Sequence, residues 1–234
     1  MGKIKAVFFD VDNTLYDTAT QVESARLNAV KSMIEAGLKV DENKALERLT
    51  EIVKKYGSNY RMHYDRLLES FNIKPNPRIV SAGLVAYANA KVAYIVPYPE
   101  TVPTLIELVK EGLKLGIVSE GLQVKQWEKL VRLGVQHFFD VVVIAEENPK
   151  GKTKELFMEA CGQIKCKPDE CMMVGDRIDK DIAGANKAGL TTVQILTEKY
   201  SKTKPKSESE MPNYVVKSLG EVAKLVRRIN QQQR

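Results

Sequence analysis

The sequence predicts an α/β protein built on a doubly wound parallel sheet, with an all-helical segment inserted after the first strand. Apolar residues of strand-like composition open the chain, and helical periodicity without convincing strands then extends over residues 17–94. From there to the C-terminus, short apolar strands alternate with helices, as in βαβ units. The expected domains are therefore a core of residues 1–16 and 95–234 and an insertion of residues 17–94.

Length and charge limit the classes of function. The 234 residues suffice for one large domain or a domain with an insertion. Although the net charge is +6, basic residues are mixed with acidic ones outside 199–206 and 227–228. This mixture favours a solvated surface that attracts a small anionic substrate over one that binds nucleic acid or membranes. No apolar run approaches the roughly 20 residues of a bilayer span. With no signal-peptide pattern at the N-terminus, we expect a cytoplasmic monomer or homodimer.

The first expected strand, residues 3–11, carries two acids at its end. Asp10 and Asp12 follow the apolar run Val7-Phe8-Phe9. In an extended backbone, residues two apart point to the same face, whereas a chain reversal after Asp10 would bring Asp12 back over it. Two acids meet at the end of a buried strand in both cases, without a basic residue between them. Such a pair favours a divalent cation or proton transfer over packing.

Four apolar stripes predict the helices of the insertion, because their members are spaced by three and four residues. The stripes are Ala25, Ala29 and Met33; Leu46, Leu49, Val53 and Tyr56; Tyr60, Tyr64, Leu67, Leu68 and Phe71; and Ile79, Gly83, Leu84, Tyr87 and Ala88. Pro97 and Pro99 mark the return of the chain to the core.

The rest of the chain is expected to alternate between helices and strands. The strands are short and apolar without polar alternation, which suits a sheet covered on both faces. The helices are expected over 101–111, 123–133, 152–162, 179–188 and 218–231, and the strands over 113–118, 141–144, 172–174, 191–196 and near 214–216. The polar segment 201–211 is expected to form a surface loop. Three evenly spaced cysteines, Cys161, Cys166 and Cys171, lack the close pairing and fourth ligand of a zinc site, so we expect reduced thiols.

Polar residues follow four of the expected strands, at the edge where open α/β sheets bind ligands. They are Asp10 and Asp12 after the first strand, Ser119, Glu120 and Gly121 after the second, Lys150 and Lys152 after the third, and Gly175, Asp176, Asp179 and Asp181 after the fourth. Acids, a hydroxyl and a lysine gathered at one edge from four strands are difficult to explain as turn residues alone.

Each motif also has another interpretation. Asp10 to Thr14 begins like a calcium loop, but the turn glycine and the distal glutamate are absent. Gly151-Lys152-Thr153 ends like a P-loop, but Glu146 stands where the first glycine should be. Ser119 could cap a helix. Asp176 or Asp179 could also cap one, and Asp181 could favour a helix dipole.

Taken together, these residues resemble the haloacid dehalogenase-like hydrolase superfamily, in the branch with a helical cap inserted after the first motif. Asp10-Val11-Asp12-Asn13-Thr14 resembles motif one, with Asn13 in place of the commoner glycine. Ser119 resembles motif two, and the segment 175–181 resembles motif four. The resemblance covers essentially the whole chain, including the order of cap and core.

Motif three matches less well. Its lysine usually lies six residues before a phenylalanine, and here Gly151 has that offset from Phe157, with Lys150 and Lys152 on either side. We favour Lys152, because it opens the next expected helix, and Lys150 is the alternative. Glu120 is a second departure, since asparagine or aspartate more commonly follows the motif-two residue.

The resemblance implies magnesium-dependent hydrolysis of a phosphomonoester through an aspartyl-phosphate. Asp10 would be the nucleophile, and Asp12 would protonate the leaving group and then deprotonate the attacking water. The implied metal ligands are the carboxylates of Asp10 and Asp176 and the backbone carbonyl of Asp12, with Asp181 orienting this shell. The implied substrate-binding residues are Thr14, Ser119, Glu120, Gly121 and Lys152.

The acid at Asp12 favours a phosphatase over a dehalogenase, because expelling halide requires no proton. A phosphomutase would use the same core residues, and a phosphate-binding protein without turnover is the alternative from another class. A capped site implies a small phosphorylated metabolite, such as a sugar or triose phosphate. Arg61, His63, Tyr64 and Arg66 are candidate substrate contacts from the cap.

Overall fold

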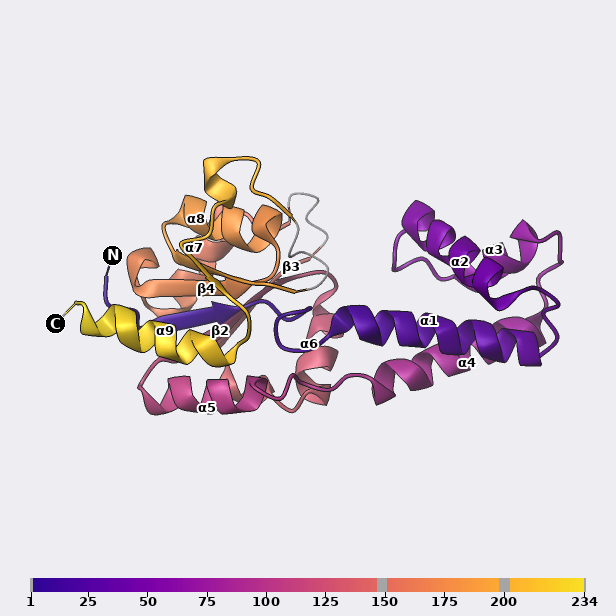
Figure 1. Cartoon of the computed structure of the whole chain (residues 1–234), viewed down its shortest axis with the longest axis horizontal. Helices are drawn as coiled ribbons and strands as arrows, with labels where there is room; N and C mark the ends of the chain where they lie inside the picture. The colour runs from indigo at the N-terminus through magenta and orange to yellow at the C-terminus, as the bar shows by residue number, and fades with distance from the viewer. Residues whose placement is uncertain (1, 147–150, 198–202, 234) are drawn as a thin grey trace. The chain divides into compact units, whose positions relative to one another are not determined.

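The computed structural model describes residues 2–146, 151–197 and 203–233, in which six strands form one parallel sheet (Figure 1). The strands are β1 (Ala6–Phe9), β2 (Lys114–Glu120), β3 (Val141–Ala145), β4 (Cys171–Gly175), β5 (Thr191–Ile195) and β6 (Tyr214–Val216). Their order across the sheet is β3-β2-β1-β4-β5-β6, and every neighbouring pair is parallel. The predicted α/β fold with a parallel sheet is confirmed.

The helices follow the predicted alternation closely. They are α1 (Thr18–Glu35), α2 (Glu42–Tyr56), α3 (His63–Ser70), α4 (Pro77–Ala93), α5 (Thr101–Lys110), α6 (Gln123–Arg132), α7 (Lys154–Ile164), α8 (Ala183–Ala188) and α9 (Gly220–Gln231). Short 3₁₀ turns lie at η1 (Gln136–Phe138), η2 (Pro168–Glu170) and η4 (Glu208–Glu210). The helix expected over 179–188 instead begins as a π-helical turn, η3 (Ile178–Ile182), and continues as α8.

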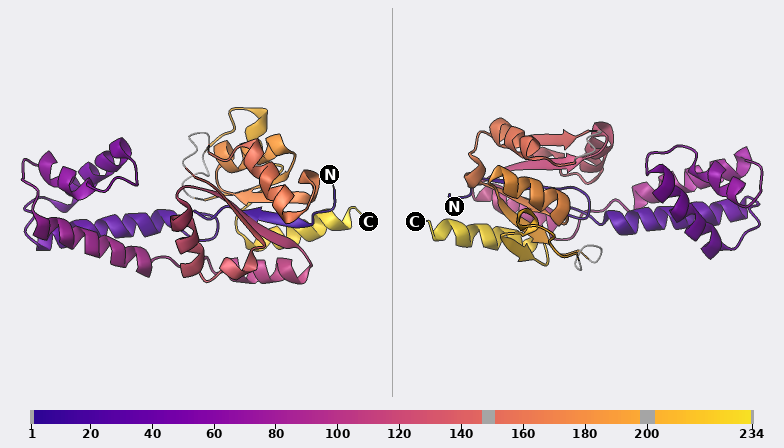
Figure 2. Two further views of the ribbon diagram at one scale, coloured as in Figure 1. Left: turned by 180° about the vertical axis from the view of Figure 1, so that it is seen from behind. Right: turned by 90° about the horizontal axis from the view of Figure 1, so that it is seen from above.

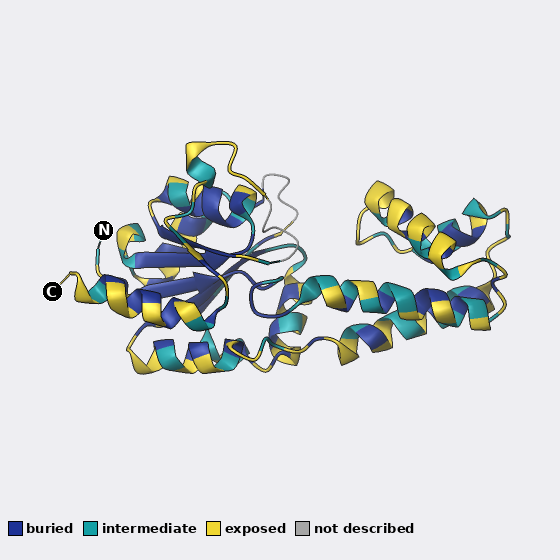
Figure 3. Cartoon of the chain, viewed as in Figure 1, coloured by how far each residue is buried: buried dark blue, intermediate teal, exposed yellow. Residues whose placement is uncertain are grey.

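Helices cover both faces of the sheet. α7 and α8 pack together on one face, and α5 and α9 pack together on the other (Figures 1 and 2). All four residues of β1 are fully buried, and the neighbouring strands are mostly buried as well (Figure 3). The core between the sheet and α7 includes Phe8, Met173 and Phe157. Burial on both faces explains why these strands are continuously apolar.

The strand order places the topological switch beside β1. The chain passes from β1 to β2 on one side and later reaches β4 on the other. Phe9, the last residue of β1, is in register with Ile117 of β2 and Val174 of β4. The residues that follow these three strands are therefore brought to one edge of the sheet, where doubly wound folds bind ligands.

Residue contacts divide the chain into two compact units, residues 1–18 with 96–234, and residues 19–95. The second unit is helical and has its own core, which includes Met33, Leu49 and Leu67. Its helices begin at recognisable caps. The Asp41 side chain accepts the backbone N–H of Lys44 at the start of α2, and Asn76 caps α4 immediately before a proline.

The three cysteines are free thiols, as expected. Cys161 and Cys171 are buried, and Cys166 is half-buried. Among the described residues, no helix has both the length and the apolar character needed to span a bilayer.

Candidate active site

A tight turn after β1 positions Asp10. The backbone N–H of Asp10 still donates to Val174 of β4 at 3.0 Å, as a continuation of the sheet. The chain then reverses, and the Leu15 N–H donates to the Val11 carbonyl at 3.0 Å. Asn13 lies in the left-handed region, with φ of 55°. Asparagine tolerates this conformation better than most residues, so it can replace the glycine common at this position of motif one.

Asp10 is buried beside a hydroxyl and an ammonium group. The Ser119 hydroxyl donates to Asp10 Oδ1 at 3.0 Å, and Lys152 Nζ lies 2.6 Å from the same oxygen. No hydrogen bond from the described residues reaches Asp10 Oδ2. Burial raises the pKa of Asp10 to about 6 against the opposing effect of Lys152, so the carboxyl is ionised at neutral pH. Its two oxygens therefore have different surroundings.

Three buried acids meet at this edge of the sheet. Carboxylate oxygens of Asp10, Asp176 and Asp181 lie within 4.8 Å of one another. Lys152 Nζ also lies 2.6 Å from Asp181 Oδ1, which places one ammonium group between two of the acids. Burial, together with Asp181 and Asp10, raises the pKa of Asp176 to about 8. Asp176 Oδ1 is buried and has no hydrogen-bond partner among the described residues. The cluster therefore holds more negative charge than this one lysine balances.

The π-helical turn η3 directs Asp181 into the cluster. Asp181 Oδ2 accepts the backbone N–H of Arg177 at 2.9 Å, which fixes the carboxylate over the end of β4. A Cβ atom at Gly175 would lie 2.3 Å from Asp181 Oδ2, so only glycine leaves room for this side chain. Single π-helical turns occur frequently at functional sites.

Gly184 has a similar role for Lys152, which gives the first testable prediction. A Cβ atom at Gly184 would lie 2.2 Å from the Lys152 carbonyl oxygen and 2.7 Å from the Phe157 ring. We therefore expect Gly184→Ala to lower the free energy of unfolding by about 1–3 kcal/mol through overpacking, measured by urea denaturation. The control is Gly162→Ala in α7, where the added Cβ meets nothing within 4 Å. It should be neutral or stabilising by about 0.5–1 kcal/mol. Equal effects of the two variants would contradict the steric argument.

Asp12 is not part of the acid cluster. It accepts hydrogen bonds from three side chains, and the sequence did not predict the most important of these, Lys129. Lys129 Nζ of α6 donates to both carboxylate oxygens, at 2.7 Å to Oδ1 and 2.6 Å to Oδ2. The Thr18 and Tyr16 hydroxyls also donate to Oδ1, at 2.8 and 3.1 Å. Burial alone would raise the pKa of Asp12, but Lys129 outweighs it and holds the pKa below its ordinary value. Lys129 follows Asp12 by 117 residues, and no motif marks it.

The remaining expected substrate-binding residues have varied surroundings. The Thr14 hydroxyl is buried without a hydrogen-bond partner among the described residues. The Glu120 carboxylate accepts from Lys180 and lies 3.9 Å from Arg177. The backbone N–H of Gly121 donates to the Ala145 carbonyl at 3.1 Å. The roles of these residues toward a substrate stay predictions.

Of the two candidate lysines of motif three, Lys152 points into the cluster and is 5% exposed. Lys150 lies outside the described residues. The contacts of Lys152 with Asp10 and Asp181 give it the position that the resemblance implies for this lysine.

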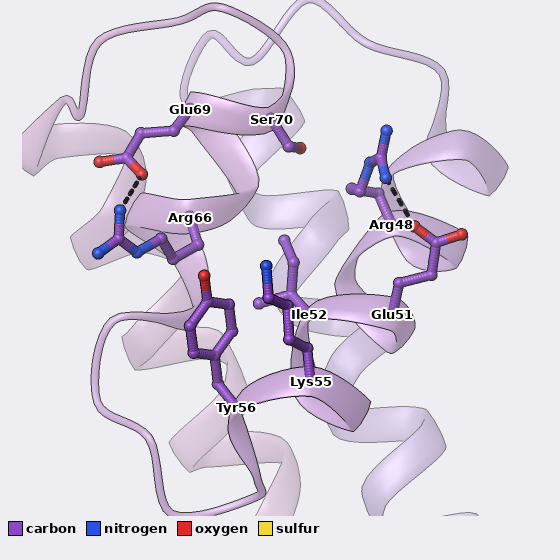
Figure 4. Close-up of a pocket in the computed structure, with 8 residues that line it drawn as sticks. All are labelled: Arg48, Glu51, Ile52, Lys55, Tyr56, Arg66, Glu69 and Ser70. Carbon is purple, nitrogen blue, oxygen red and sulfur yellow. Dashed lines mark hydrogen bonds and ion pairs between the residues drawn. The ribbon is translucent and has the colours of Figure 1, made fainter.

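Three of the four candidate contacts from the second unit, His63, Tyr64 and Arg66, have partners within that unit. Tyr64 is buried in its core, and His63 Nε2 lies 2.9 Å from the Gly57 carbonyl. Arg66 pairs with Glu69 at 2.7 Å and lines a surface pocket of about 370 Å³ between α2 and α3 (Figure 4). The pocket also contains the ion pair of Arg48 and Glu51, so its charges are largely balanced internally.

Comparison with known proteins identifies the family. The model of the haloacid dehalogenase-like hydrolases matches residues 4–189. This chain belongs to that hydrolase family. A glyceraldehyde 3-phosphate phosphatase of Methanopyrus kandleri is 47% identical over 97% of this chain and 98% of its own. The enzyme of the same name from Methanocaldococcus jannaschii is 44% identical, again over 97% and 98%.

A solved structure agrees with this assignment. The HAD phosphatase from Thermococcus onnurineus superposes with a TM-score of 0.63 and 26% sequence identity, covering 95% of this hydrolase and 98% of its own chain. The acid cluster of this hydrolase thus lies at the carboxyl edge of a sheet that other hydrolases of the family share.

Proposed function

We propose that this hydrolase is a magnesium-dependent phosphatase that acts on a triose phosphate, with glyceraldehyde 3-phosphate as the first candidate. The observation that carries the chemistry is the buried cluster of Asp10, Asp176 and Asp181 around Lys152. The substrate is suggested by relatives that are 44–47% identical over nearly the whole chain and carry that activity in their names.

The residues of the cluster fit a magnesium ion. Mg²⁺ prefers carboxylate oxygens, and Asp176 Oδ1 is a buried carboxylate oxygen without a partner among the described residues. No described donor competes for Asp10 Oδ2 either. We therefore propose three ligands, the carboxylates of Asp10 and Asp176 and the backbone carbonyl of Asp12. Asp181 would orient these ligands. When bound, the cation would offset the negative charge of the phosphoryl group and reduce its repulsion from Asp10.

The side chains can perform the two halves of phosphoryl transfer. Asp10 Oδ1 faces Ser119 and Lys152, the groups suited to hold phosphoryl oxygens. Lys129 holds the resting Asp12 carboxyl ionised, so Asp12 first takes up a proton from solvent. A bond then forms between Asp10 Oδ1 and phosphorus while the bond to the leaving oxygen breaks, and the leaving oxygen takes that proton from Asp12. Water then attacks phosphorus, loses its proton to Asp12 and releases the Asp10 carboxylate. Inorganic phosphate is released, Asp12 returns the proton to solvent, and the enzyme is back in its starting state.

The raised pKa of Asp176 leads to a prediction about metal removal. Its folded-state pKa of about 8 exceeds the ordinary value of 3.8, so the folded protein binds more protons between these pH values. The contribution of Asp176 to the free energy of unfolding must therefore fall as pH rises from about 4 to 8 in metal-free protein. Magnesium replaces this proton, so the stabilisation by Mg²⁺ should be larger at pH 8 than at pH 6.

Thermal melting in chelator and in excess Mg²⁺, at both pH values, measures this difference. Asp176→Asn should remove most of the pH dependence and most of the Mg²⁺ effect, because an amide does not ionise. Equal stabilisation by Mg²⁺ at the two pH values would contradict the assignment of Asp176 as the protonated ligand.

The proposed substrate is tested by phosphate release from a panel of phosphorylated metabolites. We expect kcat/KM for glyceraldehyde 3-phosphate to exceed that for sugar phosphates, with no activity in chelator. The panel should include dihydroxyacetone phosphate, glycerol 3-phosphate, glucose 6-phosphate and p-nitrophenyl phosphate, with an enzyme-free blank for each. Activity on p-nitrophenyl phosphate but not on triose phosphates would retain the phosphatase and reject the substrate. No Mg²⁺-dependent hydrolysis of any ester would favour a protein that binds phosphate without turnover.

Two alternatives on the same scaffold give different products. A dehalogenase would release halide from a 2-haloacid, and a phosphomutase would isomerise a sugar phosphate without net release of phosphate. The acid at Asp12 favours hydrolysis of an ester over dehalogenation, because an alkoxide needs a proton to leave whereas a halide does not. We further propose that the helical unit, residues 19–95, is the cap domain.

A further inference from the structure

Lys129, a lysine distant in the sequence, hydrogen-bonds to Asp12, the acid that would transfer protons. Lys129 lies on α6, whereas Asp12 lies in the turn after β1. The ammonium group of Lys129 has three hydrogen-bond donors. Two are directed to the carboxylate oxygens of Asp12 at 2.7 and 2.6 Å, and the third to Gln126 Oε1 at 3.3 Å. All three donors therefore have acceptors, so the ammonium group is held in one orientation.

Gln126 connects this lysine to the end of β2, the strand that carries Ser119. Gln126 is 4% exposed, which is unusual for a glutamine. Its Nε2 donates to the Glu120 carbonyl at 2.8 Å, and this bond turns Oε1 toward Lys129. Gly121, with φ of 117°, allows the approach, because a Cβ atom there would lie 3.2 Å from Gln126 Nε2. Through this network, the end of β2 helps to determine where Lys129, and hence Asp12, is held.

The contacts also distinguish the two oxygens of Asp12. Oδ1 accepts from Tyr16, Thr18 and Lys129. Among the described residues, Oδ2 accepts only from Lys129. Since an ionised carboxylate offers about four lone-pair sites, Oδ1 is crowded and Oδ2 retains capacity for a further partner. Oδ2 is therefore the oxygen that can receive or deliver a proton.

This is more than an exposed ion pair. The side chains of Lys129 and Asp12 are 17% and 32% exposed, and three further side chains, Tyr16, Thr18 and Gln126, hydrogen-bond to them. An isolated surface pair would constrain neither side chain strongly. We propose that Lys129 is a positioning residue, which fixes the Asp12 carboxylate so that Oδ2 serves proton transfer in both halves of the reaction. This inference rests on the proposed phosphatase function.

The test compares two substrates that differ in their need for a proton. p-Nitrophenolate leaves without protonation, whereas the alkoxide of glyceraldehyde 3-phosphate needs the proton of Asp12 to leave. In Lys129→Met, we expect kcat/KM for glyceraldehyde 3-phosphate to fall by about 100-fold, the scale of general acid catalysis, because the loss of position outweighs the easier protonation of an Asp12 that no longer faces Lys129. The value for p-nitrophenyl phosphate should change less than about threefold, because kcat/KM reports only formation of the aspartyl-phosphate for this ester.

A second readout follows the other half of the reaction. Since water also needs Asp12 as its base, aspartyl-phosphate should accumulate in Lys129→Met. Rapid mixing with p-nitrophenyl phosphate should then show a burst of p-nitrophenolate, equal to the enzyme concentration, followed by slow turnover. A merely structural lysine would produce neither the burst nor the difference between substrates.

Controls separate this inference from the proposed function. Arg132→Met removes the same charge from α6, where Arg132 forms an exposed ion pair with Glu128 of the same helix, and this variant should match wild type on both esters. If Lys129→Met does not fold, Lys129→Gln takes its place. The ratio of the kcat/KM values for the two substrates, measured on one preparation, does not depend on the fraction of enzyme that is active. Equal losses on both substrates, or no loss, would overturn the role of Lys129 while leaving the phosphatase intact. A wild type inactive on both esters would instead overturn the proposed function, and the inference with it.

Discussion

The Asp10→Asn variant should release phosphate at least about 10⁴-fold more slowly than wild type, because an amide is a poor nucleophile toward phosphorus. Asp10 is the acid that Ser119 and Lys152 both contact, so no neighbouring carboxylate has the same setting. The amide has nearly the same shape, and its oxygen can still accept from Ser119. The loss should therefore appear in kcat for every ester tested, with the fold retained.

Phosphate release under saturating substrate and Mg²⁺ measures this loss, and circular dichroism confirms the fold. Asp169→Asn is a suitable control, since Asp169 is exposed and lies in η2, before the amino end of β4. This control should keep wild-type turnover. Turnover by Asp10→Asn within tenfold of wild type would exclude Asp10 as the nucleophile and would leave the acid cluster without its proposed chemistry.

The Lys152→Met variant should lose both stability and activity. The Lys152 ammonium group lies 2.6 Å from Asp10 and 2.6 Å from Asp181, and both acids are buried. Removing one partner of a buried ionic group leaves uncompensated charge, which typically costs about 3–5 kcal/mol. We expect a loss of this size in the free energy of unfolding of metal-free protein near neutral pH. Activity should fall by about 10²–10³, as on loss of one donor that stabilises transition-state charge.

Urea denaturation in chelator measures the stability loss, and two comparisons test its cause. Lowering the pH should reduce the difference between variant and wild type, because the unpaired carboxyls can then take up protons. Lys187→Met, an exposed lysine of α8, should change stability by no more than about 0.5 kcal/mol. A Lys152→Met variant as stable as wild type in chelator would show that the cluster does not depend on this lysine for charge balance.

The arrangement of helices and strands was predictable because its signals are local. Apolar runs and helical stripes specify the elements that are observed as β1 to β6 and α1 to α9. The rule that parallel sheets bind ligands at their carboxyl ends then brings Asp10, Ser119 and Asp176 to one edge. Asp181 was expected among the metal-site residues, orienting the shell, and its carboxylate lies within the cluster. The π-helical turn that places it there has no simple periodicity.

The surroundings of Asp12 show what local patterns do not contain. The spacing of Asp10 and Asp12 suggested that two acids meet at the end of the strand, yet the described cluster contains Asp181 in addition to Asp10 and Asp176, and Asp12 faces Lys129 instead. In the sequence, Lys129 looks like any lysine on the solvent-facing side of a helix. Its contacts with Asp12 and the buried Gln126, and its partial burial, distinguish it from Lys125, the other lysine of α6.

By itself, the sequence determined the class of fold, the family and the set of acids from which a catalytic centre could be built, because these depend on residue type and short-range spacing. Only the tertiary structure decided that Lys152 lies in the acid cluster, which described carboxylate oxygens remain without donors and which residue holds Asp12. Those features depend on the directions of side chains from segments more than 100 residues apart, such as Ser119 and Asp10. Such directions are set by packing between elements, and no single segment of the chain encodes them.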